Sequence, residues 1–156
     1  MLKVRIIALG KNKGDWIEGG CRHFQKLLSR YARVELVGVP AVRASSGLSP
    51  KEILRKEAAA IDKHLGAGMV VVLSDRGDKF DSHAFAKRLE KWQTTCGGTI
   101  QFVIGSAWGL DDAVLGRADL VLSLSEMTFS HQLVRLVLLE QLYRAFSILN
   151  NTDYHK

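Results

Sequence analysis

A histidine and two arginines interrupt a strongly apolar segment of the chain, residues 131–149. His131 and Arg135 lie four residues apart, a spacing that places both side chains on one face of a helix. Charged groups on a covered helix are costly unless they are paired or meet a polar partner. We therefore expect Arg135 to bind phosphate or to order the loop before the helix. His131 by itself is a weak signal of function.

Glu140 and Arg144 are a second pair at the same spacing. Residues four apart are neighbours on a helix surface, so an intrahelical ion pair is one interpretation, and such pairs are common. The other interpretation is that these charges belong to a functional site. The sequence leaves the two interpretations equally open.

Three strand-like stretches end in small or polar residues, at Leu73-Ser74-Asp75, Gly105-Ser106 and Leu124-Ser125. In open parallel sheets, ligands bind beyond the carboxyl ends of the strands, so these turns would converge if their strands are neighbours. Gly105 and Gly109 allow backbone N–H groups to approach a ligand closely. A small ligand with an adenosine part could be held there by backbone groups, although each glycine taken singly predicts only a turn.

An α/β scaffold is needed to position these turns. Apolar and β-branched runs predict strands at 2–9, 33–39, 69–73, 99–104 and 119–124. Apolar periodicity and capping signals predict helices at 15–31, from Ser49 to about 65, from Asp81 onward, after Asp111 or Asp112, and at 131–149. Strands that alternate with helices predict one α/β domain, residues 1–156, with a mainly parallel sheet.

The segment 131–149 leaves no wide polar face. A helix that is apolar nearly all round must be covered on several sides. We expect the sheet to cover one side and a second subunit to cover another.

Positive charge is concentrated near the N-terminus. The formal net charge is +6 and the sequence pI is about 9.5, which favour a polyanionic partner. Between residues 1 and 33 the only acidic residues are Asp15 and Glu18. The basic residues there are Lys3, Arg5, Lys11, Lys13, Arg22, Lys26, Arg30 and Arg33. This imbalance predicts a face that meets a nucleic-acid backbone, rather than a merely solvated one.

Several other classes of protein fit the sequence poorly. Cys21 and Cys96 are isolated, so we expect neither a disulfide framework nor a metal site. Residues 1–9 alternate like a strand and no apolar run is long enough to span a membrane, so we expect a cytoplasmic protein. The turn at 10–14 lacks the glycine pattern that binds dinucleotides and the lysine-serine ending of a nucleotide phosphate loop.

Five motifs together resemble one known family, and the resemblance spans essentially the whole chain. The motifs are FVIG at 102–105, WGL at 108–110, LSLSEMTFSHQLVR at 122–135, EQLYRAF at 140–146 and YHK at 154–156. They are similar to the ribosomal RNA large subunit methyltransferase H family, which belongs to the SPOUT methyltransferases. The resemblance implies a parallel-sheet SPOUT fold with a C-terminal trefoil knot, which physical reasoning alone would not propose because threaded chains are rare.

The resemblance also implies an activity and its partners. Members transfer a methyl group from S-adenosylmethionine to N3 of a pseudouridine in a hairpin loop of 23S ribosomal RNA, and they act as homodimers. For this chain we expect the assembled ribosome to be the substrate. The family's cofactor contacts fall on Leu73, Gly105, Leu124, Ser125, Glu126, Met127, Thr128 and Phe129.

This chain departs from the family pattern at three positions. Many relatives have a second glycine where Ser106 stands, and a small or polar residue where Trp108 stands. Trp108 would therefore narrow or cover the cofactor loop. Ser130 replaces a common proline, and a serine at that position can cap the following helix.

The expected catalytic residues must position the base and ease the loss of its proton. They are His131, Arg135, Arg144, Tyr154 and His155. Tyr154 could stack on a nucleobase, and the tail that carries it would form a substrate clamp that reaches the partner subunit's cofactor. The expected RNA-binding residues are Arg22, Lys26 and Lys156.

Two alternatives stay open at the level of sequence. One is a non-catalytic RNA-binding or ribosome-assembly protein that keeps the α/β scaffold. The other is a SPOUT methyltransferase that modifies another RNA position, because a fold does not determine a function. Binding of the methyl donor separates the first alternative, and analysis of the modified nucleoside separates the second.

Overall fold

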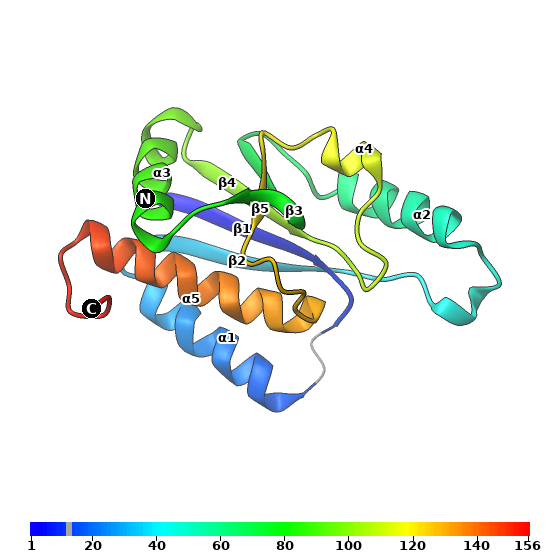
Figure 1. The fold of residues 1–156 in the computed structure, drawn as a ribbon, viewed down its shortest axis with the longest axis horizontal. Coiled ribbons are helices and arrows are strands. Elements are labelled where there is room, and N and C mark those ends of the chain that lie inside the picture. The colour runs from blue at the N-terminus through cyan, green and yellow to red at the C-terminus, as the bar shows by residue number, and fades with distance from the viewer. Residues whose placement is uncertain (12–13) are drawn as a thin grey trace.

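The computed structural model describes residues 1–11 and 14–156. Within these residues the chain forms a five-stranded sheet in which neighbouring strands are parallel (Figure 1). In spatial order the strands are β2 (Ala32–Val39), β1 (Leu2–Leu9), β4 (Thr99–Ile104), β3 (Met69–Lys79) and β5 (Leu120–Ser123). The α/β architecture expected from the alternating sequence pattern is therefore confirmed.

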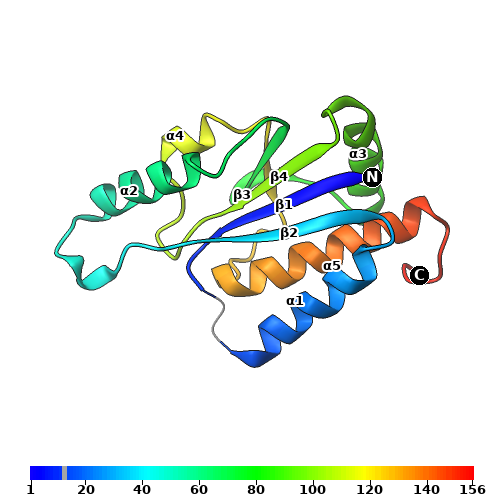
Figure 2. The ribbon, with the colours of Figure 1, turned by 180° about the vertical axis from the view of Figure 1, so that it is seen from behind.

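Helices cover both faces of the sheet (Figures 1 and 2). On one face α5 (His131–Leu149) lies between α1 (Asp15–Leu28) and α3 (Ser82–Thr95). On the other face lie α2 (Pro50–Asp62) and the short α4 (Asp112–Leu115). A short 3₁₀ turn, Ala44–Ser46, lies in the loop between β2 and α2. Coverage of both faces explains why the strands are nearly continuous apolar runs.

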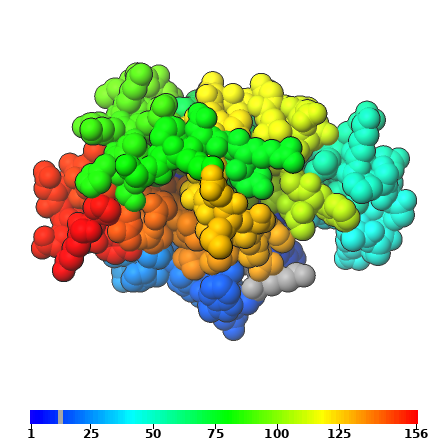
Figure 3. All heavy atoms as spheres, in the orientation of Figure 1, coloured from blue at the N-terminus to red at the C-terminus, as the bar shows by residue number. Residues whose placement is uncertain are grey.

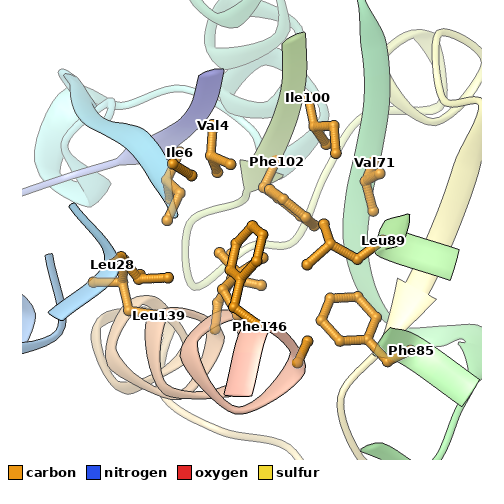
Figure 4. Close-up of a cluster of buried hydrophobic side chains, with 14 of the residues drawn as sticks. Val4, Ile6, Leu28, Val71, Phe85, Leu89, Ile100, Phe102, Leu139 and Phe146 are labelled. Atoms are coloured by element: carbon orange, nitrogen blue, oxygen red, sulfur yellow. The ribbon is translucent and has the colours of Figure 1, made fainter. Parts of the chain in front are cut away.

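The core lies mainly between the sheet and α5. Successive side chains of a strand point to opposite faces, so Val4 and Ile6 of β1 join the core under α5, whereas Ile7 joins the core under α2. Figure 4 shows Ile6 of β1 and Phe102 of β4 on the sheet side, with Leu139 and Phe146 of α5 opposite them. The expectation that the sheet covers one side of α5 is confirmed.

Side-chain caps begin most of the helices where the sequence predicted them. The Ser49 hydroxyl accepts a hydrogen bond from the Glu52 amide at 3.2 Å, and the Glu52 carboxylate accepts one from the Ser49 amide at 2.7 Å. Asp81 caps α3, and Asp111 rather than Asp112 caps α4. Ser130 accepts a hydrogen bond from the Leu133 amide, so it caps α5, as the sequence predicted.

β3 is longer than its apolar run predicted. The strand was expected to end at residue 73 and turn at Ser74, but it continues to Lys79. Its pairing with β5 shifts register, since both Leu73 and Asp78 pair with Leu122. Polar residues 74–79 carry no apolar signal, so their strand conformation follows from pairing with β5, a contact distant in sequence.

Gly77 allows β3 and β5 to approach this closely. A Cβ atom at residue 77 would lie 2.6 Å from the Val121 carbonyl oxygen, closer than real Cβ atoms come to backbone. Only glycine is compatible with this contact between the two strands. The threading of the C-terminal segment into a trefoil knot stays a prediction.

Candidate functional site

A pocket of about 830 Å³ lies beside three neighbouring strands, at the ends of β4 and β5 and along the C-terminal part of β3. Its walls come from the C-terminal part of β3, the loop after β4 and the segment that follows β5. Figure 3 shows these segments, in green, yellow-green and gold, meeting on one face of the molecule. β3 lies between β4 and β5 in the sheet, which explains why the three predicted segments converge, although residues 73–75 belong to the strand itself and form no turn.

The loop after β4 is a tight turn. A Cβ atom at Gly105 would lie 2.5 Å from the Gly109 carbonyl oxygen, so this position requires glycine. Ser106 and Gly109 form an isolated bridge across the loop, and the Trp108 amide donates a hydrogen bond to the Ser106 hydroxyl at 3.3 Å. The whole loop, residues 105–109, lines the pocket. The indole of Trp108 is half exposed at its rim.

The segment between β5 and α5 forms the opposite wall and is ordered by serines. The Ser123 hydroxyl donates to the Ser125 carbonyl oxygen at 2.9 Å, and the Met127 amide donates to the Ser125 hydroxyl at 3.0 Å. The predicted cofactor contacts that line the pocket are Leu73, Gly105, Leu124, Ser125, Met127, Thr128 and Phe129. The structure therefore brings together residues that are distant in the sequence.

Glu126 is the exception among the predicted cofactor contacts. Its carboxylate pairs with the Lys79 ammonium at the end of β3 and does not line the pocket. The hydrogen bond and the charge of Lys79 lower the pKa of Glu126 below its ordinary value. A cofactor role for the Glu126 side chain stays a prediction.

His131 and Arg135 lie at the start of α5, but they face different surroundings. His131 lines the pocket. Arg135 is 5 % exposed, and its Nη2 donates to the carbonyl oxygens of Leu9 and Gly10 at 2.7 and 2.8 Å. Burial lowers the pKa of the guanidinium, which nevertheless stays charged at neutral pH. Arg135 thus holds the C-terminal end of β1, rather than the loop before α5.

The other expected catalytic residues gather near the C-terminal end of α5. Arg144 Nε donates to Glu140 Oε1 at 3.1 Å, which confirms the intrahelical ion pair. The Tyr154 hydroxyl donates to the same oxygen at 3.0 Å, and the Arg144 guanidinium lies 4.9 Å from the Tyr154 ring. Burial and the hydrogen bond to Glu140 raise the pKa of Tyr154. The tail is therefore bound to α5 rather than frayed.

Arg144 also favours one tautomer of a neutral His155 ring. Arg144 Nη1 lies 3.2 Å from His155 Nδ1. A guanidinium can only donate, so Nδ1 accepts, and the neutral imidazole carries its hydrogen on Nε2. The His155 ring meets the His83 ring edge-on, with ring centres 4.8 Å apart.

The basic residues near the N-terminus divide into two groups. Lys3 and Arg5 of β1 bind Glu35, and Arg5 Nη1 also donates to the His64 carbonyl oxygen at 2.7 Å, so both serve the fold. Lys3 is nevertheless exposed, and the other exposed basic residues are Lys11, Arg22, Lys26, Arg30 and Arg33, of which Arg22 pairs with Glu18 at 3.2 Å. Lys13 lies outside the described residues. The predicted basic face is therefore smaller than the sequence suggested. Lys156 is also exposed at the end of the tail.

Sequence reasoning missed Glu57 of α2, which approaches the pocket loop. Its side chain is 2 % exposed, and Oε1 accepts a hydrogen bond from the Ser106 hydroxyl at 2.7 Å. The signal was present, because Glu57 lies four residues from both Ile53 and Ile61, on the buried stripe of an amphipathic helix. An acidic residue on such a stripe predicts a buried polar contact.

The part of the chain that the structure describes contains neither a metal-binding cluster nor a membrane-spanning helix. No group of three or more histidine, cysteine, aspartate or glutamate side chains there is arranged to hold a metal ion. None of the described helices is long and apolar enough to cross a membrane.

The whole chain is similar to proteins that transfer methyl groups. The profile of the family described as "Predicted SPOUT methyltransferase" matches residues 2–155. "Ribosomal RNA large subunit methyltransferase H" of Acetivibrio thermocellus is 42 % identical, over 99 % of this chain and 100 % of that protein. The protein of the same name from Symbiobacterium thermophilum is 40 % identical over the same shares.

Solved structures with low sequence identity to this chain have a similar fold. A probable methyltransferase from Bordetella pertussis superposes with a TM-score of 0.59 at 14 % identity, over 91 % of this chain and 93 % of that chain. A probable methylase family protein from Haemophilus influenzae superposes with a TM-score of 0.58 at 17 % identity, over 99 % of this chain and 70 % of that chain. The family profile and the full-length relatives show that the chain belongs to the ribosomal RNA large subunit methyltransferase H family of SPOUT methyltransferases.

Proposed function

We propose that this protein transfers a methyl group from S-adenosylmethionine to N3 of a pseudouridine in a hairpin loop of 23S ribosomal RNA, on the assembled ribosome. The observation that carries the proposal is the pocket beside the tight glycine turn that follows β4. Its other walls are the C-terminal part of β3 and the segment after β5. Full-length relatives whose names describe a large-subunit ribosomal RNA methyltransferase support the RNA substrate.

The pocket has a partly apolar wall and suits a nucleoside. Leu73, Leu124 and Phe129 supply apolar wall, while the loop at Gly105 and the turn at Ser125 supply backbone groups for polar edges. Its volume of about 830 Å³ lies within the range of small-molecule sites. S-adenosylmethionine, when bound, supplies an electrophilic methyl group on a sulfonium centre. The protein must then position the nucleobase in line with that methyl group.

Methylation of an imide nitrogen also requires loss of its proton. His131 is the candidate acceptor, since it lines the pocket and imidazole titrates near neutral pH. The Nε2 hydrogen of His155 and the guanidinium of Arg144 are donors that can bind the carbonyl oxygens beside N3. Such bonds would stabilise the negative charge that develops on the base as the proton leaves.

Two copies of the chain are needed to bring these groups together. His131 begins α5 and Arg144 lies near its other end, about 20 Å away at 1.5 Å per residue. A homodimer packed around α5 would place the tail of one copy over the pocket of the other. Leu136 and Val137 of α5 are only half-buried in the single chain, as expected for a helix that a second copy covers.

The RNA itself would be held by the exposed basic residues. Arg22 and Lys26 lie on α1, and Lys156 ends the tail. Contacts between such residues and phosphate are independent of sequence and weaken with salt. A small basic surface is consistent with a target whose shape is already formed, such as the assembled ribosome.

The test uses ribosomes and RNA from cells that lack the modification. The pure protein is incubated with labelled S-adenosylmethionine and, separately, with whole ribosomes, large subunits or free RNA, and the digested RNA is analysed by mass. Methylpseudouridine in 23S RNA, formed fastest on whole ribosomes, is the expected result. A methylated nucleoside of another kind would indicate a different RNA position. Absence of both methyl transfer and cofactor binding would instead indicate a non-catalytic RNA-binding protein.

A further inference from the structure

A buried carboxylate on the far side of the sheet reaches the loop that cradles the pocket. Glu57 projects from α2, is 2 % exposed, and accepts the Ser106 hydroxyl hydrogen at 2.7 Å. The other carboxylate oxygen, Oε2, is buried and has no hydrogen-bond partner among the described residues. Burying such a group lowers stability, so a fold selected for stability alone would place an apolar side chain here.

The Ser106 hydroxyl joins this carboxylate to the pocket loop. It donates to Glu57 and at the same time accepts a hydrogen bond from the Trp108 amide at 3.3 Å. Because the Ser106 hydroxyl hydrogen bonds Glu57, a lone pair of the Ser106 oxygen is directed toward the Trp108 amide. The three residues therefore form one continuous chain of hydrogen bonds from α2 to the rim of the pocket.

The loop is also closed by its own backbone, since the Gly109 amide donates to the Ser106 carbonyl oxygen at 3.0 Å, whereas the hydrogen bond to Glu57 ties the loop to another element, α2. Ser106 and Trp108 both line the pocket, and the indole of Trp108 is 47 % exposed, so packing alone does not hold it. A glycine at residue 106 would have no hydroxyl for Glu57 to bind. The carboxylate thus has a partner on the loop only because this chain has serine at that position.

We propose that Glu57 is a positioning residue, which acts through Ser106 to hold residues 105–109 in the conformation that binds the methyl donor and places Trp108 at the pocket rim. The proposal rests on the proposed function for the identity of the donor. In this proposal α2 controls the affinity of the pocket for the methyl donor, although no residue of α2 lines the pocket.

The test compares Glu57→Met, Glu57→Gln and Ser106→Ala in the full-length protein. Methionine fills similar space but cannot accept the hydroxyl hydrogen, whereas glutamine can. Calorimetry should show that Glu57→Met and Ser106→Ala weaken S-adenosylmethionine binding about tenfold, as expected for loss of a hydrogen bond to a charged group. Glu57→Gln should restore most of the affinity, and adding Glu57→Met to Ser106→Ala should cause no further loss.

Thermal unfolding separates positioning from a structural role. Glu57→Met removes the unpartnered oxygen, so its unfolding temperature should equal or exceed that of the wild type while its affinity falls. Asp62→Asn is the matched control, because it removes a carboxylate from an exposed position on the same helix and should leave affinity unchanged. Wild-type affinity in Glu57→Met, or a joint loss of affinity and stability, would overturn the proposal.

A second measurement does not depend on the donor. Exchange of the Trp108 amide hydrogen, followed by NMR in the ligand-free protein, should be faster in Glu57→Met and Ser106→Ala than in the wild type. Unchanged exchange would overturn the proposal. If wild-type protein binds no S-adenosylmethionine while exchange responds as expected, the proposed function fails and the positioning of the loop by Glu57 stands.

Discussion

His131 and Arg144 belong to the same helix and lie near its opposite ends, about 20 Å apart along α5. His131 lines the pocket, whereas Arg144 binds Glu140 and the Tyr154-His155 tail. Groups this far apart cannot contact one nucleobase. If both act in catalysis, each active site must combine the pocket of one copy with the tail of another.

Mixed dimers test this arrangement. Gly105→Ala alters the pocket and a Tyr154→Ala/His155→Ala chain alters the tail, so each variant alone should be nearly inactive. After the subunits are exchanged in equal amounts, about a quarter of the wild-type activity should return, since half of the dimers would contain one intact site. The measurement is methyl transfer to ribosomes before and after exchange. Absence of any recovery, with mixed dimers demonstrated by mass, would place the whole site within one copy.

Gly105→Ala should by itself reduce binding of the methyl donor about ten- to a hundredfold. The new methyl group would lie 2.5 Å from the Gly109 carbonyl oxygen, and relief of such a contact displaces backbone. Calorimetry measures the affinity. Gly19→Ala in α1 is the control, because a Cβ there meets nothing within 4 Å and should stabilise the helix by about 0.5–1 kcal/mol. Equal affinity of the two variants for the methyl donor would show that the close contact between Gly105 and Gly109 does not matter for binding.

Gly77→Ala should lower the free energy of unfolding by about 2 kcal/mol or more. The reason is the contact of residue 77 with the backbone of Val121 where β3 passes β5. Denaturant unfolding measures the change, and Gly38→Ala on edge strand β2, where the space is open, serves as control. A loss no larger than that of the control would contradict the close strand approach.

Tyr154 should ionise at a higher pH than an ordinary tyrosine. Burial and donation to Glu140 favour the neutral phenol, so its folded-state pKa lies above 10.0. The contribution of the tail contact to stability is then complete below pH 10 and is lost as the pH rises through the folded-state pKa. The difference in ultraviolet absorbance between wild type and Tyr154→Phe follows this titration. A midpoint at or below pH 10 would mean that the tail is not bound to α5 in solution.

Sequence patterns predicted the helix starts correctly where these depend on residues close together in the chain. The capping box at Ser49 and the caps at Asp81 and Ser130 depend on residues within one turn, and each occurs as expected. The extension of β3 to Lys79 was missed, because its partner Leu122 is far away in the chain. Arg135 was expected to bind phosphate or to order the loop before α5; its Nη2 donates to carbonyl oxygens at the end of β1, and binding of phosphate stays a prediction.

By itself, the sequence determined the helix starts set by caps, the alternation that makes a parallel sheet, and the three segments that line one pocket, although the segment at Leu73-Ser74-Asp75 lies within β3 rather than at its end. Apolar periodicity and turn chemistry are short-range properties, and they can be read from neighbouring residues. The tertiary structure alone decided that Glu57 reaches Ser106, that Lys79 pairs with Glu126, and that the tail binds the end of α5 remote from the pocket. Those contacts join residues far apart in the chain, so they arise only when packing of the core brings the elements together.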